Sequence, residues 1–288
     1  MTAEFYHQPV MVKEVIDSLI VSRAGVYVDG TVGGAGHSYA ILKQTDALLI
    51  GIDCDDEALR FAEKRLQEFG SRKILLKENF VNLDHILKSL NIEKVDGVLL
   101  DLGVSSHQLD TEERGFRYLE DAPLDMRMNQ QQTLTAADVV NHYDAAQLQG
   151  VFSKYGEVTN AKTLAQHIVK ARAGSPINTT GQLADVADQC VKGLRMRYLS
   201  QLFQALRIEI NDEMGALKAL LMSAHEVLKP EGRVAVISYH SLEDRLVKRY
   251  CKSGNFEGEP DTDLFGRRKE LWEVITQRPI EPDEEEQR

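Results

Sequence analysis

The sequence predicts an α/β fold, in which a parallel sheet covered by helices on both faces is interrupted by an inserted helical domain. Three observations predict it. Residues 26 to 103 alternate short apolar runs with segments of helical spacing, which is typical of a parallel sheet buried on both sides. Residues 105 to 215 show helical spacing without a convincing strand. An apolar run at 233–239 then resumes the strand pattern.

The expected strands of the first segment are short runs dominated by apolar and β-branched residues. They are Val26–Asp29, Ala47–Asp53, Lys73–Lys77 and Val95–Leu102. A helix is expected to begin near His37, after a glycine cluster. Further helices are expected over Asp55–Phe69, whose acidic first turn suits the helix dipole, and over Leu83–Leu90.

Helices dominate the middle of the chain. The expected ones are Ala136–Val140, Ala145–Tyr155, Ala161–Arg172, Thr180–Gly193 and Tyr198–Ile210. A helix over Met214–Leu228 should stop at Lys229-Pro230-Glu231-Gly232. The remaining elements are expected to be a strand at Arg233–Tyr239, a helix at Glu243–Cys251 and a late strand at Leu271–Thr276. The expected domains are residues 1–104 and 216–288, which together form the sheet domain, and the helical insert 105–215.

Composition excludes several classes of protein. With 288 residues, 43% hydrophobic and 27% charged, the chain has the balance of a globular protein. A net charge of −11 argues against coating nucleic acid by bulk charge, but leaves room for a local basic face. The three cysteines form no close pair, so neither a disulfide framework nor a zinc site is indicated. Without a signal segment or a long apolar run, the sequence favours a reduced, cytoplasmic location and no membrane partner.

The strongest chemical signal is VYVDGTVGGAGHS, residues 26 to 38. Glycines let the backbone approach a ligand closely, and the start of the following helix offers N–H groups. Asp53 ends the second expected strand, where its carboxylate can accept hydrogen bonds from ribose hydroxyls. The combination predicts a nucleoside cofactor at the carboxyl edge of the sheet. The alternative is a tight turn beside an unrelated acidic residue.

The spacing narrows the kind of nucleoside. The dinucleotide pattern G-x-G-x-x-G fails because Tyr39 stands at its third glycine, which disfavours an NAD-dependent oxidoreductase. A phosphate-binding loop of the GK[ST] type is also missing. S-adenosylmethionine has no pyrophosphate and needs neither pattern. Phe80 follows the third expected strand and is either an adenine contact or a core residue.

Asp101 ends the fourth expected strand and has two interpretations. In one, its carboxylate accepts a hydrogen bond from an amine that is being methylated, which holds the nitrogen in line with the methyl group. In the other, it orders the following loop or binds cofactor. His240 follows the fifth expected strand, where we favour a substrate-positioning or loop-ordering role. No residues at ligand spacing indicate a metal.

Several longer motifs identify a family. They are His7-Gln8-Pro9-Val10, Asp29-Gly30-Thr31 with Gly36-His37-Ser38, Asp101 to Ser106 with Gln108-Leu109-Asp110, Arg114-Gly115-Phe116, Leu124 to Met128, Phe203 to Ile208 and Ser238 to Arg245. In this order they closely resemble the RsmH (MraW) family. Members of that family are bacterial enzymes that use S-adenosylmethionine to methylate N4 of a cytidine in 16S ribosomal RNA, near the decoding site of the small ribosomal subunit.

The resemblance implies a Rossmann-like class I methyltransferase sheet with an all-helical domain inserted after the fourth strand. It also implies a set of cofactor contacts. They are Ala35, Gly36, His37, Asp53, Phe80, Asp101 and Gln108. Asp101 as the catalytic amine acceptor remains our interpretation of the residues themselves. Family members usually continue into a basic final strand, whereas this sequence ends at Arg288. Either the chain is shortened there or this member lacks the strand.

Three basic clusters are candidates for contacts with RNA phosphates. They are Lys192–Tyr198, the helically spaced Arg245, Lys248, Arg249 and Lys252, and Arg267–Lys269. For any one of them, ordinary solvated surface is the better explanation. Two other functions stay open on sequence grounds. One is a methyltransferase of the same fold with another substrate, and the other is a catalytically weak assembly factor that binds ribosomal RNA.

Overall fold

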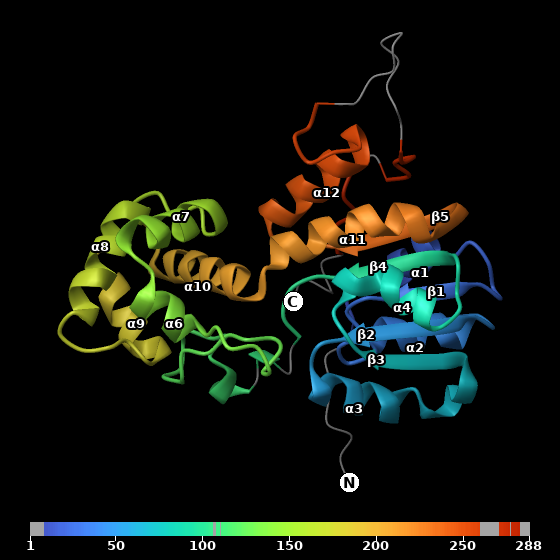
Figure 1. The fold of residues 1–288 in the computed structure, drawn as a ribbon, viewed down its shortest axis with the longest axis horizontal. Coiled ribbons are helices and arrows are strands. Elements are labelled where there is room, and N and C mark those ends of the chain that lie inside the picture. The colour runs from blue at the N-terminus through green and yellow to red at the C-terminus, as the bar shows by residue number, and fades with distance from the viewer. Residues whose placement is uncertain (1–8, 106–107, 110, 260–270, 277, 283–288) are drawn as a thin grey trace. The chain divides into compact units, whose positions relative to one another are not determined.

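The computed structural model describes residues 9–105, 108–109, 111–259, 271–276 and 278–282. The chain divides into two compact units (Figure 1). The first unit comprises Met1–Gly103 and Gly215–Arg288, and the second comprises Val104–Met214. These limits lie one residue from the boundaries expected at 104 and 215.

The first unit is built on a parallel sheet with the strand order β3-β2-β1-β4-β5 (Figure 1). The strands are β1 (Val26–Asp29), β2 (Leu48–Asp53), β3 (Lys73–Lys77), β4 (Val95–Asp101) and β5 (Leu228–Ile237). This is the mixed α/β architecture that the sequence predicts. Because the chain leaves β1 toward β2 and later returns on its other side at β4, the strand order reverses between β1 and β4.

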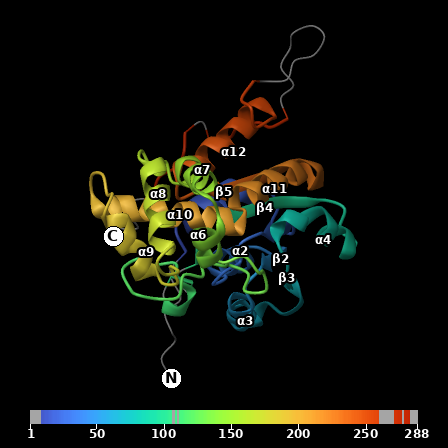
Figure 2. The same ribbon diagram turned by 60° about the vertical axis from the view of Figure 1, so that its left-hand side comes forward.

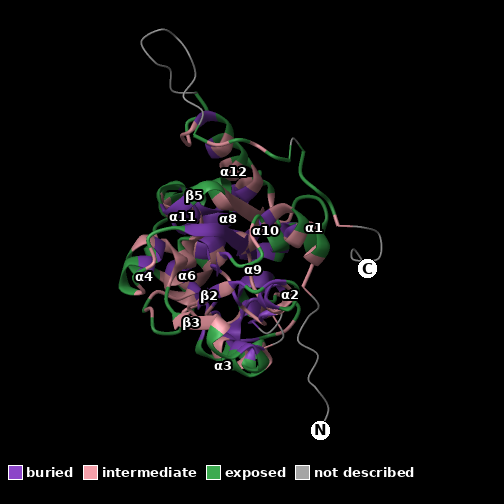
Figure 3. Cartoon of the chain, turned by 90° about the vertical axis from the view of Figure 1, so that its right-hand side faces the viewer, coloured by how far each residue is buried: buried purple, intermediate pink, exposed green. Residues whose placement is uncertain are grey.

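Helices cover both faces of this sheet (Figure 2). Alternate residues of each strand pack into the core clusters on the two faces. Val28 packs in the cluster that includes α4 (Leu83–Ser89) and α11 (Glu213–Val227). Tyr27 packs in the cluster on the opposite face, and its hydroxyl donates a hydrogen bond to the Ser22 carbonyl oxygen. That cluster includes α1 (Val12–Leu19), α2 (Gly36–Gln44) and α3 (Asp56–Arg65). Figure 3 shows buried strand residues enclosed by helices whose outer sides are exposed.

The segment Lys229-Pro230-Glu231-Gly232, expected as a helix stop signal, follows the end of α11 and also forms a bulge in β5. The helix ends at Val227, as the sequence predicts, but β5 begins at once with Leu228. Val95 pairs with Leu228 whereas Gly97 pairs with Arg233, so residues 229–232 bulge out of the ladder. The Lys229 ammonium binds Asp96 Oδ2 at 2.7 Å, which fastens the bulge to β4.

The late strand expected at Leu271–Thr276 is wrong, because the structure has no strand at these residues. Leu271 and Ile275 are exposed, whereas the Trp272 side chain packs beside α11 and α12 (Ser241–Ser253). Its ring centroid lies 5.7 Å from that of His225. Aromatic packing on helices therefore replaces strand pairing as the way in which this segment buries apolar surface.

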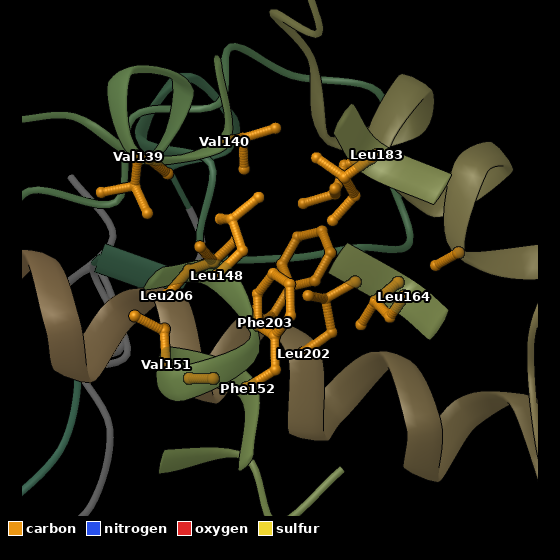
Figure 4. Packing of buried hydrophobic residues seen from close by; sticks show 14 of the residues in the cluster. Val139, Val140, Leu148, Val151, Phe152, Leu164, Leu183, Leu202, Phe203 and Leu206 are labelled. Atoms are coloured by element: carbon orange, nitrogen blue, oxygen red, sulfur yellow. The ribbon is translucent and has the colours of Figure 1, made fainter. Parts of the chain in front are cut away.

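The second unit is helical. Its helices are α6 (Ala136–His142), α7 (Ala145–Tyr155), α8 (Ala161–Arg172), α9 (Thr180–Asp188) and α10 (Arg195–Asn211). Phe152 and Leu202 are buried at its centre, with side chains from all five helices around them (Figure 4). Three of the helices begin with a capping box, at Thr135, Asp144 and Thr179, which explains why their start positions were clear in the sequence.

A long segment before α6 is held against these helices by polar contacts. The Arg114 guanidinium donates hydrogen bonds to the carbonyl oxygens of Arg127 and Met128. The Asn211 side chain donates to the Met126 carbonyl oxygen and accepts from the Met128 N–H. These contacts satisfy backbone groups that no helix or sheet would otherwise pair.

None of the helices in the described part of the chain is both long and apolar enough to span a membrane.

Two glycines of the second unit predict opposite effects of the same substitution. A Cβ at Gly156, at the end of α7, would lie 2.6 Å from the Gln201 carbonyl oxygen, whereas a Cβ at Gly150 meets nothing within 4 Å. We expect Gly156→Ala to lower the free energy of unfolding by about 1–3 kcal/mol. Gly150→Ala should raise it by about 0.5–1 kcal/mol, because alanine favours the helix. Urea unfolding followed by circular dichroism checks both, and equal effects would contradict the close packing at Gly156.

Candidate active site at the carboxyl edge of the sheet

Three neighbouring strands end in an aspartate. Asp29 ends β1, Asp53 ends β2 and Asp101 ends β4. Because parallel strands present their carboxyl ends on one edge, the three side chains share that edge. It is also the edge where ligands bind in open α/β sheets, at the point where the strand order reverses.

The glycine turn connects β1 to α2 on this edge. Gly33 and Ala35 both adopt a positive φ, of 44° and 55°, and α2 begins at Gly36. The first N–H groups of the helix therefore face the edge of the sheet. A Cβ at Gly36 would lie only 2.6 Å from the Pro9 ring. Glycine is thus needed at position 36 for close packing of the chain, a requirement separate from any ligand.

Asp53 joins the second strand to the turn. Its Oδ2 accepts a hydrogen bond from the Gly33 N–H at 2.9 Å, and its Oδ1 accepts one from the Asp55 N–H at 2.9 Å. Burial raises the pKa of Asp53 to about 6, although these two hydrogen bonds oppose the rise. Each carboxylate oxygen can accept more than one hydrogen bond, so the side chain can still bind a hydroxyl group. The structure therefore brings Asp53 and the glycine turn together.

Asp29 is a buried carboxylate beneath the turn and only 2% exposed. Its Oδ2 accepts a hydrogen bond from the Ser38 hydroxyl at 2.6 Å, and its Oδ1 accepts one from the Thr31 N–H at 3.2 Å. Burial raises the pKa of Asp29, and both hydrogen bonds work against that rise. Asp29 therefore links the end of β1 to the first turn of α2, and it fixes the path of the chain between them.

Asp101 is surrounded by groups from three other parts of the unit. Its backbone N–H donates to Thr31 Oγ1 at 2.7 Å, which ties β4 to the glycine turn. His37 Nδ1 lies 3.7 Å from Asp101 Oδ2, and His37 Nε2 lies 2.8 Å from the Val10 carbonyl oxygen. The buried His37 side chain thus connects Asp101 to the N-terminal segment. The Asp101 side chain itself stays partly exposed.

The sequence analysis missed one residue of this edge. Tyr239 lies just beyond β5, and its hydroxyl donates a hydrogen bond to Asp101 Oδ1 at 2.9 Å. The residue is 58% exposed. A signal was available, because Tyr239 stands at the carboxyl end of an expected strand, as Asp101 does.

The other expected contact residues differ in their surroundings. Phe80 opens the short helix η2 (Phe80–Asn82), packs against the core on one side of the sheet and approaches Gly30. It combines a core contact with a place near the edge, so both interpretations of it stay open. Gln108 belongs to the second unit. Its side-chain oxygen accepts a hydrogen bond from the Ser105 N–H, and its backbone N–H donates one to Ser105 Oγ.

His240 has a structural place at the start of α12. It is the N-cap residue of that helix, and its Nε2 lies 3.2 Å from the buried carboxylate of Glu243. The Tyr239 N–H donates to the other Glu243 oxygen at 3.0 Å. These contacts agree with a loop-ordering role for His240.

The first basic cluster is partly occupied by an internal contact. Arg195 pairs with Asp188 through two hydrogen bonds of 2.7 and 2.9 Å, while Lys192 and Arg197 are exposed on the same stretch. Leu194 and Met196 are exposed beside them. The cluster at Arg267–Lys269 lies outside the described residues, as do His7, Gln8, Ser106 and Asp110 of the motifs.

Comparison by sequence matches the chain to one family of proteins. A sequence model of the MraW methylase family matches residues 4–288. A protein of Cytophaga hutchinsonii named ribosomal RNA small subunit methyltransferase H is 46% identical over 283 residues, which are 98% of this chain and 94% of that protein. A protein of Christiangramia forsetii with the same name is 48% identical over 91% of this chain and 86% of its own. Among solved structures, the cyclopropane synthase MmaA2 of Mycobacterium tuberculosis matches 68% of this chain and 77% of its own at 11% identity, with a TM-score of 0.28.

The buried bond between Ser38 and Asp29 predicts a cost in stability. Ser38→Ala removes one donor from a buried carboxylate, and we expect the free energy of unfolding to fall by about 1.5–3 kcal/mol. Ser153→Ala is the matched control, because the hydroxyl of that exposed serine donates to the Gly150 carbonyl oxygen of its own helix. Its removal should change the free energy of unfolding by less than about 0.5 kcal/mol. Chemical unfolding measures both, and similar values for the two variants would argue against a stabilising Ser38–Asp29 bond.

Proposed function

Because the chain belongs to the MraW methylase family, we propose that it transfers a methyl group from S-adenosylmethionine to N4 of a cytidine in 16S ribosomal RNA, near the decoding site of the small ribosomal subunit. The match to this family over residues 4–288 carries the proposal. The names of the relatives support the class of substrate. The edge that holds Asp53, the glycine turn and Asp101 supports the chemistry.

The residues at this edge fit a nucleoside methyl donor. Asp53 offers carboxylate oxygens beside the turn, as ribose hydroxyls require, and the start of α2 offers the backbone N–H groups of Gly36 and His37. The Ala35 N–H donates to the Val32 carbonyl oxygen, so Ala35 is expected to contact the cofactor through its other atoms. Phe80 supplies an aromatic surface for the adenine ring. Gln108 stays a predicted cofactor contact, as the resemblance to the family implies. When bound, S-adenosylmethionine supplies a methyl group activated by its sulfonium sulfur.

Asp101 is the residue that we assign to the amine. Its carboxylate accepts a hydrogen bond from the N4 amino group, which aims the nitrogen lone pair at the methyl carbon. A bond forms between N4 and that carbon while the bond from carbon to sulfur breaks, and its electron pair stays on sulfur. The nitrogen then carries a positive charge and releases a proton, for which the Asp101 carboxylate is the nearest acceptor in this arrangement.

The substrate must present an unpaired base. N4 of a paired cytosine is engaged in its base pair, so the target nucleotide has to be opened or flipped before transfer. We assign the first unit as the methyltransferase domain, and the second as an inserted helical domain whose exposed Lys192 and Arg197 contact phosphates. As an enzyme of bacterial small subunits, it is proposed to work in the cytoplasm.

The direct test is transfer of a labelled methyl group to small ribosomal subunits that lack the modification, followed by nucleoside analysis. We expect the label on N4-methylated cytidine. Label on another nucleoside would contradict the proposed substrate. No transfer, despite tight binding of S-adenosylmethionine, would favour a catalytically inactive assembly factor.

A substitution at Asp101 tests the assigned role. Asp101→Asn keeps the shape but removes the charge that receives the proton, so we expect kcat to fall by about 10²-fold. The dissociation constant for S-adenosylmethionine should stay within about threefold, since it depends mainly on Asp53 and the turn. Asp84→Asn on α4 removes a half-exposed carboxylate and serves as the control. A loss of cofactor affinity in Asp101→Asn, with unchanged turnover at saturation, would reassign Asp101 to binding.

The raised pKa of Asp53 predicts pH-dependent cofactor binding. The ionised carboxylate is the stronger acceptor for ribose hydroxyls, and with a pKa of about 6 it is lost as the pH falls through that value. Affinity should therefore be full at about pH 8 and about tenfold weaker at pH 5. In Asp53→Asn, affinity should be low at both pH values, and the only pH dependence left should be that of the ligand's own ionisable groups. Calorimetry over this range checks the difference, and parallel curves for the two proteins would refute it.

A further inference from the structure

Tyr239 is held at both ends while its ring stays exposed. Its hydroxyl donates to Asp101 Oδ1 at 2.9 Å, and its backbone N–H donates to the buried carboxylate of Glu243 at 3.0 Å. The ring edge lies over Gly103, where a Cβ would approach it to 3.3 Å. Even so, the residue is 58% exposed. Fixing a large aromatic ring without burying it costs conformational entropy that little apolar burial offsets.

The hydrogen bond also restricts Asp101. The phenol occupies a lone pair of Oδ1, and His37 Nδ1 lies 3.7 Å from Oδ2. The backbone N–H of Asp101 is held by Thr31. The carboxylate plane is therefore set by groups on both sides of it, and a rotation of its side chain would break the bond to Tyr239.

We propose that Tyr239 positions both reactants of the methyl transfer: its hydroxyl fixes the orientation of the Asp101 carboxylate, and its exposed ring is the surface on which the target base stacks. This inference rests on the proposed function and deepens it. An exposed aromatic face beside the amine acceptor is what an unpaired base needs, because stacking of a base on an aromatic side chain contributes about 1–3 kcal/mol. Stacking would hold the ring of the base while Asp101 holds its amine.

The two tasks predict separable kinetic effects. Tyr239→Phe keeps the stacking surface and removes the hydroxyl, so we expect kcat to fall about tenfold, with KM for the small subunit within about twofold. The carboxylate also loses a donor to its charged form, so the acidic limb of the kcat profile should move to higher pH. Tyr239→Leu removes the aromatic face, and KM should rise by about tenfold or more. Tyr239→Trp should restore KM but not kcat.

The second unit provides a matched control. Tyr143 makes the same kind of bond, from its hydroxyl to Glu209 Oε1 at 2.9 Å, within the second unit. Tyr143→Phe should leave kcat, KM and the pH profile unchanged. S-adenosylmethionine affinity and the unfolding midpoint, measured for every variant, show that each one is folded and binds cofactor.

The outcomes separate this inference from the proposed function. An active wild-type enzyme whose kcat and pH profile are unaltered by Tyr239→Phe would overturn the positioning of Asp101. An unaltered KM in Tyr239→Leu would overturn the stacking. A wild-type protein that binds S-adenosylmethionine but methylates no cytidine in small subunits would overturn the proposed function itself, and this inference with it.

Discussion

The need to satisfy carboxylates that lie partly or fully out of water shapes the edge of the sheet. Asp29 and Asp53 sit where burial raises their pKa, and each is supplied with donors by the glycine turn or by α2. A buried charge without such partners would cost several kcal/mol. The turn between β1 and α2 therefore has a structural task as well as a chemical one. Its Gly33 N–H stabilises Asp53, which the proposed cofactor site uses, and the Ser38 hydroxyl stabilises Asp29 beneath the turn.

The location of this edge could be predicted from the sequence because it depends on local patterns. Apolar runs that end in Asp29, Asp53 and Asp101 place three carboxylates at the carboxyl ends of parallel strands without any knowledge of distant contacts. The capping boxes of the helical unit are local in the same way, and the expected helix starts at Ala136, Ala145 and Thr180 coincide with the observed ones. The roles of the site residues stay predictions.

Contacts between residues far apart in the chain could not be predicted in this way. The bond between Tyr239 and Asp101 depends on the register of β5 against β4, and the bulge at residues 229–232 changes that register by three residues. The packing of Pro9 on Gly36 likewise joins segments that no periodicity relates. For Leu271–Thr276, strand-like composition was misleading because Trp272 found aromatic partners on the helices. Propensity in a short apolar segment yields to such tertiary contacts.

The position of β5 in the chain has a consequence for synthesis. β4 is complete at Asp101, but its neighbour on one side, β5, begins only at Leu228, after the whole helical unit. While the ribosome makes the intervening residues, β4 is an edge strand whose backbone N–H and C=O groups are unpaired on one side. Such a strand is a template for pairing with other chains. Tyr239 also emerges only then. The polypeptide therefore needs its last quarter before either the sheet or the surroundings of Asp101 are finished, and a premature stop in the helical unit would leave an aggregation-prone fragment.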